Sequence, residues 1–239
     1  MPEEKRKIIK EKVIDGLKAR IYDDKTVETD EFYYRIENVI ASADLNIIEK
    51  LDLGELEERL RNIPEVEVRY QPKQFPGLVL KIHADQVKAS ALIFSEGKAV
   101  LSGIRELDKV EEIVEAIVDI LEKAGAKIGK PKVEILNIVA LADLKAEVDL
   151  ELAAIRLEEN ALYEPEQFPG LIYRLRIVKP ECDDRYELGE IERKCIENVA
   201  VMLFSSGKAV ISGAKSEDVI FRAIKELKER LREEEVLKG

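Results

Sequence analysis

Apolar residues recur at helical spacing in two kinds of segment. The short segment DLGELEERL opens with Asp52 and has Glu55 three residues later, the spacing of a capping box, and its leucines share one face. The longer segment DKVEEIVEAIVDILEKAG has one apolar side and stops at Gly125, as helices often do. A second long segment of this type, SEDVIFRAIKELKERL, stands near the end of the chain. These patterns predict short and long amphipathic helices.

The segments between the helices have the character of strands. Runs such as GLVLKI, SALIF and AVLSG are short and apolar, and the tight-turn sequences SEGK and SSGK separate consecutive runs. The runs lack the polar alternation of a strand with one solvated face. Helices combined with an antiparallel sheet predict the α+β class.

The same elements occur twice along the chain. Three stretches match between the copies: QFPGL (74–78 and 167–171), IENVIASADL with ILNIVALADL (36–45 and 135–144), and ALIFSEGKAVLSG with VMLFSSGKAVISG (91–103 and 201–213). Matches of this extent indicate a tandem duplication. We expect an N-terminal extension over residues 1–33, a first repeat over 34–130, and a second repeat over 131–239 with an insertion near 179–197.

The strands present more apolar surface than the predicted helices can cover. Either the two sheets stack on each other, within one chain or in a homodimer, or one apolar face stays open as a binding site. The phenylalanines favour an open face. Four of the six stand at matched sites where a hairpin would bring two rings together at one end of each sheet: Phe75 and Phe94, Phe168 and Phe204.

Two of these stretches resemble a known family. YEPEQFPGLIYRL and LFSSGKAVISGAKSED are similar to motifs of archaeal TATA-box-binding proteins, and the resemblance extends over about 34–235. It implies a pseudo-symmetric saddle, in which a curved ten-stranded antiparallel sheet has four helices on its convex side. It also implies that the concave face binds the minor groove of TATA-box promoter DNA and kinks it by wedging side chains between base steps.

The resemblance assigns DNA contacts residue by residue. The intercalating side chains would be Phe75, Phe94, Phe168 and Phe204. Asparagines that donate to minor-groove acceptors would be Asn38 and Asn137. Contacts with the groove floor would come from Ile40, Val139, Val100, Val210, Ser102 and Ser212, the two serines standing where the family often has threonine. Phosphate contacts would come from Lys81, Lys98, Arg174 and Lys208.

Protein partners are implied in the same way. In the family, acidic and apolar residues beside the second Phe-Pro-Gly turn receive transcription factor B; the matching residues are Glu164, Glu166, Gln167 and Leu171. The alternative is that they are ordinary solvated turn residues. The resemblance also implies the RNA polymerase pre-initiation complex as a partner. The surplus of apolar strand face leaves a homodimer through the concave face as an option when DNA is absent.

The charge of the chain at first argues against a nucleic-acid partner. The net charge is −11, whereas phosphate neutralisation needs lysine and arginine. Burial of apolar side chains in a minor groove needs fewer cations, and a local basic set can coexist with acidic helices. No apolar run approaches the ~20 residues that span a bilayer. We therefore expect no membrane partner and a cytoplasmic, nucleoid-associated archaeal protein.

Two segments depart from the family pattern. The extension has seven basic and four acidic residues over positions 1–20 and is predicted to be partly helical, either solvated or in contact with DNA or a partner. The insertion contains Cys182 and Cys195, which could bridge its two ends, although free thiols are the favoured expectation.

The sequence holds no pattern that predicts an enzyme. It has a single histidine and no phosphate-binding glycine loop or nucleophile motif. We expect no cofactor and no metal site. Because of the two additional segments, a divergent relative that acts mainly as a protein-interaction module in transcription regulation remains the alternative function.

Overall fold

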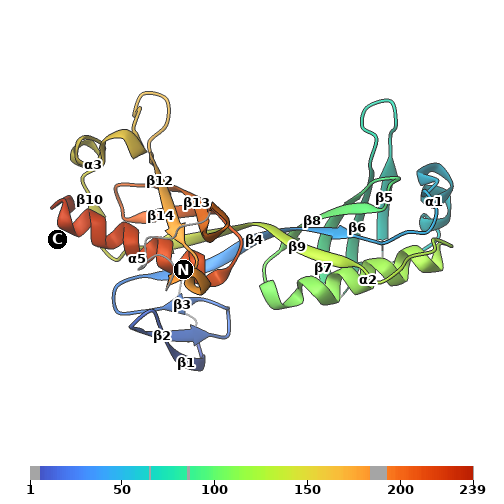
Figure 1. Ribbon diagram of the computed structural model, residues 1–239, viewed down its shortest axis with the longest axis horizontal. Coiled ribbons are helices and arrows are strands. Elements are labelled where there is room, and N and C mark those ends of the chain that lie inside the picture. The colour runs from blue at the N-terminus through green and yellow to red at the C-terminus, as the bar shows by residue number, and fades with distance from the viewer. Residues whose placement is uncertain (1–5, 65, 85–86, 184–192, 239) are drawn as a thin grey trace. The chain divides into compact units, whose positions relative to one another are not determined.

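The computed structural model describes residues 6–64, 66–84, 87–183 and 193–238 (Figure 1). The chain divides into two compact units. Asn38–Leu136 contains the first repeat, whereas Met1–Glu37 and Asn137–Gly239 together contain the extension and the second repeat. Two long strands, β4 (Tyr33–Asp44) and β9 (Lys132–Asp143), each begin in one unit and end in the other.

In the unit Asn38–Leu136 the strands form an antiparallel sheet in the order β4-β8-β7-β6-β5. Its elements after β4 are α1 (Leu53–Leu60), β5 (Val66–Tyr70), β6 (Leu78–Ala84), β7 (Val87–Ile93), β8 (Lys98–Ile104) and α2 (Val110–Lys123). A 3-10 turn (Leu107–Lys109) leads into α2.

The two helices of this unit form where the pattern predicts them. The Asp52 side chain accepts hydrogen bonds from the backbone N–H groups of Gly54 and Glu55, both at 3.0 Å, and so caps α1. The leucines of α1 and the whole apolar side of α2 are buried against the sheet: Leu53, Leu56 and Leu60; Val110, Ile113, Val114, Ile117, Ile120 and Leu121.

The second repeat builds the same arrangement in its own unit, with the strand order β9-β14-β13-β12-β11. After β9 come β10 (Glu147–Val148), α3 (Leu150–Arg156), β11 (Ala161–Leu162), β12 (Leu171–Val178), β13 (Ile196–Leu203), β14 (Lys208–Ala214), α5 (Glu217–Glu233) and β15 (Leu237–Lys238). Each repeat thus supplies five strands to the large sheet, while β10 and β15 pair separately, and the described residues contain four α-helices. This confirms the α+β class with two tandem repeats.

The described part of the extension, residues 6–33, contains strands and no helix, so the expectation of a partial helix is wrong there. Residues 8–28 form β1 (Ile8–Ile14), β2 (Leu17–Tyr22) and β3 (Val27–Glu28), with β1 on β2, β2 on β3 and β3 on β4 (Figure 1). Asp15 and Gly16 join β1 to β2 with φ of 45° and 83°. Two consecutive positive φ values are typical of a tight hairpin turn, and Asp-Gly is a preferred sequence for it. The turn therefore prevails over the helical propensity of the lysines and glutamates around it.

Side chains of α5 hold the extension against the second repeat. The Asp15 carboxylate pairs with Lys225 at 2.9 Å, and the Lys228 ammonium donates to the carbonyl oxygens of Glu31 and Leu144. Burial lowers the pKa of Lys228. The Phe32 ring packs on Phe221 of α5 with centroids 5.2 Å apart. The extension is thus part of this unit's core.

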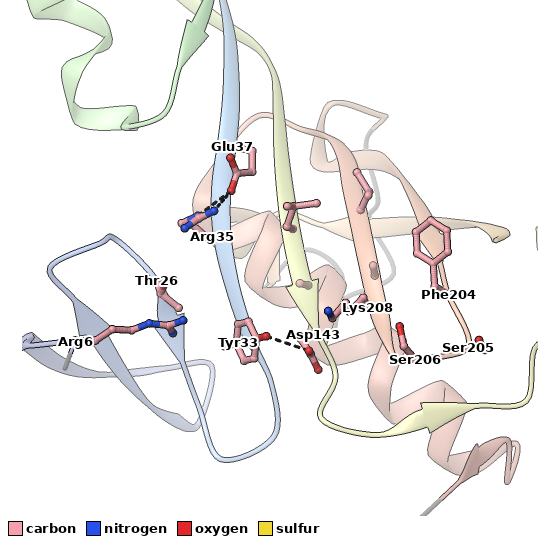
Figure 2. Close-up of a pocket in the computed structure, with 14 residues that line it drawn as sticks. Arg6, Thr26, Tyr33, Arg35, Glu37, Asp143, Phe204, Ser205, Ser206 and Lys208 are labelled. Atoms are coloured by element: carbon pink, nitrogen blue, oxygen red, sulfur yellow. Dashed lines mark hydrogen bonds and ion pairs between the residues drawn. The ribbon is translucent and has the colours of Figure 1, made fainter. Parts of the chain in front are cut away.

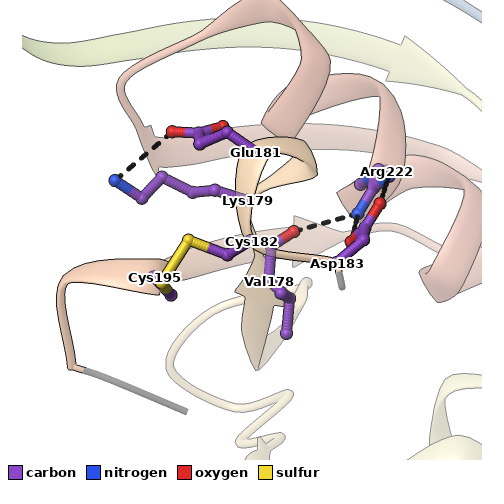
Figure 3. The surroundings of a disulfide bond; sticks show 7 residues. All are labelled: Val178, Lys179, Glu181, Cys182, Asp183, Cys195 and Arg222. Carbon is purple, nitrogen blue, oxygen red and sulfur yellow. Dashed lines mark hydrogen bonds and ion pairs between the residues drawn. A yellow bond between two sulfur atoms is a disulfide. The ribbon is translucent and has the colours of Figure 1, made fainter. Parts of the chain in front are cut away.

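The insertion is closed by a disulfide between Cys182 and Cys195, so the expectation of free thiols is wrong (Figure 3). Their Cα atoms are 5.8 Å apart, because the strands that flank the insertion, β12 and β13, pair as far as Val178 and Ile196. Next to the bridge, the Asp183 carboxylate accepts two hydrogen bonds from the Arg222 guanidinium of α5, at 2.6 and 2.5 Å. Part of the predicted insertion, residues 184–192, lies outside the described residues.

We predict that the disulfide stabilises the second repeat. Its cysteines are 13 residues apart, and closing a loop of that size in the unfolded chain is worth about 3 kcal/mol. The double variant Cys182→Ser/Cys195→Ser should lower the free energy of unfolding by that amount in guanidinium titrations. Reductant should destabilise the wild type and leave the double variant unchanged; equal stability of the oxidised and reduced wild type would contradict the prediction.

Candidate nucleic-acid interface

In each unit the helices cover one face of the sheet and leave the other face open. On the covered face, Ala41 and Leu101 of the first repeat and Ala140 and Ile211 of the second are completely buried. The alternate residues of the same strands point to the opposite face and are half-buried: Ile40, Val100 and Ser102 in the first repeat, Val139, Val210 and Ser212 in the second. All six residues expected to contact a groove floor therefore lie on the open face of their own sheet.

The open face also contains apolar residues that the sequence analysis did not single out. Leu141 stands opposite Val210 in the pairing of β9 with β14, and 45% of its surface is exposed. Met202 stands opposite Val210 from the other side, on β13. Leu141 could have been found from the period of two that starts at Asn137 and Val139. Val139, Leu141, Met202 and Val210 thus form an apolar patch on the open face of the second repeat.

The two asparagines are fixed by a β-bulge next to each of them. Gly103 and Gly213 have φ of 84° and 103°, and their backbone N–H groups donate to the Oδ1 atoms of Asn38 and Asn137 at 2.8 and 2.6 Å. An amide is planar, so engagement of the oxygen turns the Nδ2 group the other way. The described residues provide no acceptor for either Nδ2 group. Each asparagine therefore presents a hydrogen-bond donor on its open face.

The phenylalanines form the two predicted pairs. The ring centroids of Phe75 and Phe94 are 6.0 Å apart and those of Phe168 and Phe204 are 5.9 Å apart, both in edge-to-face contact. Phe75 and Phe168 keep 43% and 36% of their surface exposed. Exposed rings of this size are uncommon on a soluble surface unless they meet a partner.

A glycine beneath each pair makes room for the rings. A Cβ atom on Gly170 would lie 2.6 Å from Cε1 of Phe168 and 3.2 Å from Cε1 of Phe204. In the first repeat, a Cβ atom on Gly77 would lie 2.7 Å from Cε1 of Phe75. The Phe-Pro-Gly turn therefore folds each phenylalanine back over the glycine two residues later, which explains why the complete turn is repeated.

The four cations expected at phosphates lie on strands of the two sheets. Lys98 and Lys208 are exposed at the first positions of β8 and β14, and Arg174 is exposed on β12. Lys81 on β6 is paired with Glu67 at 3.2 Å. None of the four is buried, so each is accessible to a ligand of its own unit.

Three of the four residues expected to bind a protein partner are exposed, and one is buried. Glu164, Glu166 and Gln167 are exposed in the second Phe-Pro-Gly turn, where the Glu164 carbonyl accepts from the Gln167 and Phe168 N–H groups. Leu171, however, is completely buried opposite Leu203 at the start of β12. It belongs to the core, and its expected contact with a partner is wrong.

A cavity of about 670 Å³ adjoins the open face of the second repeat (Figure 2). It is lined by Leu141, Val210 and Phe204, by Tyr33 and Arg35 of β4, and by Arg6 and Thr26 of the extension. In Figure 2, Arg6, Thr26 and Arg35 lie across the cavity from Phe204. The Tyr33 hydroxyl donates to Asp143 at 3.0 Å. Burial and this hydrogen bond raise the pKa of Tyr33.

The described residues contain no group of three or more histidine, cysteine or carboxylate side chains that could hold a metal ion. Among the described helices, none has both the length and the apolar character needed to cross a bilayer.

Comparison with known proteins gives a single family. The family model described as "Transcription factor TFIID (or TATA-binding protein, TBP)" matches residues 33–124 and 132–234. The chain belongs to the TATA-binding protein family. The two matched segments coincide with the two repeats, whereas β1, β2 and β3 lie outside both.

Relatives of this family agree over most of their length. The TATA-box-binding protein of Pyrobaculum aerophilum is 42% identical over 205 residues, which are 85% of this chain and 88% of the relative. That of Sulfolobus acidocaldarius is 40% identical over 214 residues, 87% of this chain and 94% of the relative. The solved structure of the Methanococcus jannaschii TBP matches with a TM-score of 0.63 and 35% identity, covering 84% of this chain and 98% of that chain.

We predict that Gly170→Ala displaces the rings of the second pair only. Gly170 does not have a positive φ, so alanine fits the backbone and the strain falls on Phe168 and Phe204. In spectra of protein with ¹³C-labelled phenylalanine, the ring signals of these two residues should move while those of Phe75 and Phe94 stay in place. Gly54→Ala, whose Cβ atom would meet only Asp52 Oδ1 at 3.4 Å, is the control. Unmoved signals in Gly170→Ala would contradict the prediction.

Proposed function

We propose that this protein is an archaeal transcription initiation factor that binds the minor groove of TATA-box promoter DNA through the open faces of its two repeats. The observation that carries the proposal is the combination, in each repeat, of an open apolar face, one asparagine donor and a phenylalanine pair at the end of the sheet. The names of the relatives support a TATA-box element as the ligand.

The chemistry of this face fits A·T base pairs. The minor-groove edge of an A·T pair presents only acceptors, whereas a G·C pair adds the protruding amino group of guanine. The Nδ2 groups of Asn38 and Asn137 supply donors, and the half-buried Ile40, Val139, Val100 and Val210 supply a smooth apolar floor. Such a floor accepts the flat A·T edge and leaves a guanine amino group without a partner.

Phenylalanine burial can offset the cost of bending the duplex. Partial unstacking costs a few kcal/mol for each base step, and smooth bending costs about 1–6 kcal/mol more. Each ring that passes from water into a base step contributes about 1.5–3 kcal/mol. Phe75 and Phe168, the more exposed ring of each pair, have the most surface to gain, and Phe94 and Phe204 support them from behind.

The exposed turn of the second repeat is the proposed docking edge for transcription factor B. Glu164, Glu166 and Gln167 form it, without the buried Leu171, and Leu162 on β11 adds an apolar side chain that is 48% exposed. The first repeat has Lys73 in the corresponding turn, so its charge differs. Transcription factor B bound at this edge would in turn recruit RNA polymerase. In the absence of DNA, the open apolar faces would favour a homodimer.

We predict that Asn38→Asp and Asn137→Asp each weaken binding to a TATA duplex by about 30-fold or more. Aspartate can still accept from Gly103 or Gly213 and so preserves the bulge, but it replaces the donor with a carboxylate that faces groove acceptors, at a cost of about 2–3 kcal/mol. Fluorescence anisotropy with a labelled duplex measures the loss. Asn62→Asp, just after the C-terminal end of α1, makes the same charge change and should bind normally. Normal binding by the Asn38 and Asn137 variants would contradict the donor role.

We predict that Phe168→Ala and Phe204→Ala reduce the bending of the TATA duplex. Their rings provide the wedge of the second repeat, whereas Phe75 and Phe94 remain in the first. A duplex labelled at both ends should therefore show a smaller energy-transfer change than it does with the wild type. Ile155→Ala, which truncates an exposed apolar side chain on α3, is the control. The proposed function fails if the wild type binds TATA and G·C-substituted duplexes equally and the phenylalanine variants behave like it. That outcome would favour the alternative function as a protein-interaction module.

A further inference from the structure

The extension brings cationic side chains to the border of the open face of the second repeat. Arg6 precedes β1, and Arg35 lies on β4, the strand to which the extension is joined through β3. Both line the cavity that Leu141 and Val210 also line, and Figure 2 shows them across the cavity from Phe204. Arg6 lies outside the segments that match the family model, and its place beside the open face follows from the hairpin fold of the extension.

Backbone and carboxylate contacts hold both arginines in place. The Lys7 N–H group donates to Asp23 Oδ1 at 3.3 Å and the Asp23 N–H group donates to the Lys7 carbonyl at 2.9 Å, which ties the chain next to Arg6 to the end of β2. The Arg6 Nε atom lies 3.4 Å from Asp24. Asp24 in turn accepts from the Thr26 N–H group at 3.0 Å. The Arg6 side chain is therefore oriented before any ligand arrives.

Arg35 is oriented in a similar way. Its Nε and Nη2 atoms both donate to Glu37 Oε1, at 2.8 and 2.5 Å. A guanidinium has five N–H donors, so this contact leaves part of the group for a ligand. The side chains of Arg35 and Arg6 are 48% and 50% exposed. The cavity thus has two oriented and accessible guanidinium groups on the side away from Phe204.

We propose that Arg6 and Arg35, with Lys208 across the cavity, form a binding site for the sugar–phosphate backbone of the DNA. This inference rests on the proposed function, because the open face that adjoins the cavity must hold the duplex. Guanidinium groups bind phosphate with paired hydrogen bonds, and hydroxyl groups often complete such sites. Ser205 and Ser206, both exposed, line the same cavity and carry hydroxyl groups that can donate to phosphate.

The arrangement of charge favours a phosphate backbone as the ligand. The carboxylates that line the cavity are Glu37 and Asp143, and they are engaged by Arg35 and by the Tyr33 hydroxyl. Asp24 beside the cavity is paired with Arg6. The cationic side is also continuous with an apolar face suited to base edges. A minor groove has this same layout, with phosphates along the border of the groove and base edges at its floor.

The test compares the salt dependence of DNA binding in full-length variants. Arg6→Ala/Arg35→Ala should bind both a TATA duplex and its G·C-substituted counterpart more weakly by the same factor, since backbone contacts carry no sequence information. The slope of log affinity against log salt concentration should become less steep by about 2, one for each lost contact. Lys10→Ala/Lys18→Ala removes the same charge from exposed sites of the same hairpin, away from the cavity, and should keep the wild-type slope.

Two further variants separate the possible explanations. Arg6→Lys/Arg35→Lys preserves the charge and should recover most of the slope, which would show that loss of folding does not explain the alanine result. The inference is overturned if Arg6→Ala/Arg35→Ala keeps the wild-type slope. It is also overturned if the slope of Lys10→Ala/Lys18→Ala falls by as much as that of Arg6→Ala/Arg35→Ala. Phe168→Ala should instead bend the TATA duplex less and keep the wild-type slope. A wild type that binds the TATA and G·C-substituted duplexes equally would mean that the proposed function itself has failed, so the two failures are distinguishable.

Discussion

Helices cover only one face of each five-stranded sheet, so the other face is open to solvent or to a ligand. In each repeat the helices bury one set of alternate residues, such as Ala41 and Leu101, while the alternate set that includes Ile40 and Val100 stays half-exposed. Exposure of this apolar surface to water raises the free energy of the folded protein, and a ligand that covers the surface recovers that free energy. The other features of the proposed interface, the asparagines and the phenylalanine pairs, are placed at this open face.

Local backbone features, two bulges and two glycines, position the asparagine donors and the phenylalanine rings at the open face. The bulges at Gly103 and Gly213 turn two ordinary strand asparagines into oriented donors. The glycines at 77 and 170 allow a ring to lie where any other residue would place a Cβ atom. Both devices occur once in each repeat, so the duplication copied a local geometry together with the side chains that depend on it.

Features that depend on local spacing could be predicted from the sequence. The cap at Asp52, the buried side of α2 and the phenylalanine pairs follow from helical period and hairpin pairing, and the structure has all three. The helix expected in the extension failed because the Asp15-Gly16 turn prevailed over helical propensity.

Other features depend on contacts between residues that are far apart in the sequence. The bridge between Cys182 and Cys195 forms because two paired strands bring the ends of the insertion together. The burial of Leu171 follows from the strand register after the Pro-Gly turn, which places this side chain opposite Leu203. Arg6 reaches the open face only through the hairpin that joins β4. None of these is encoded in a pattern of neighbouring residues.

Both additional segments belong to the same unit. The hairpin of the extension and the bridged insertion are attached to α5, where Arg222 binds Asp183 and lies 3.9 Å from Asp15. A duplicated protein on a nearly symmetric A·T element has two binding polarities of almost equal free energy. Every contact confined to one repeat enters the difference between them, and about 1.4 kcal/mol suffices for a tenfold preference. The two additions enlarge only one half of the duplicated protein. They therefore supply contacts that can make one binding polarity more stable than the other.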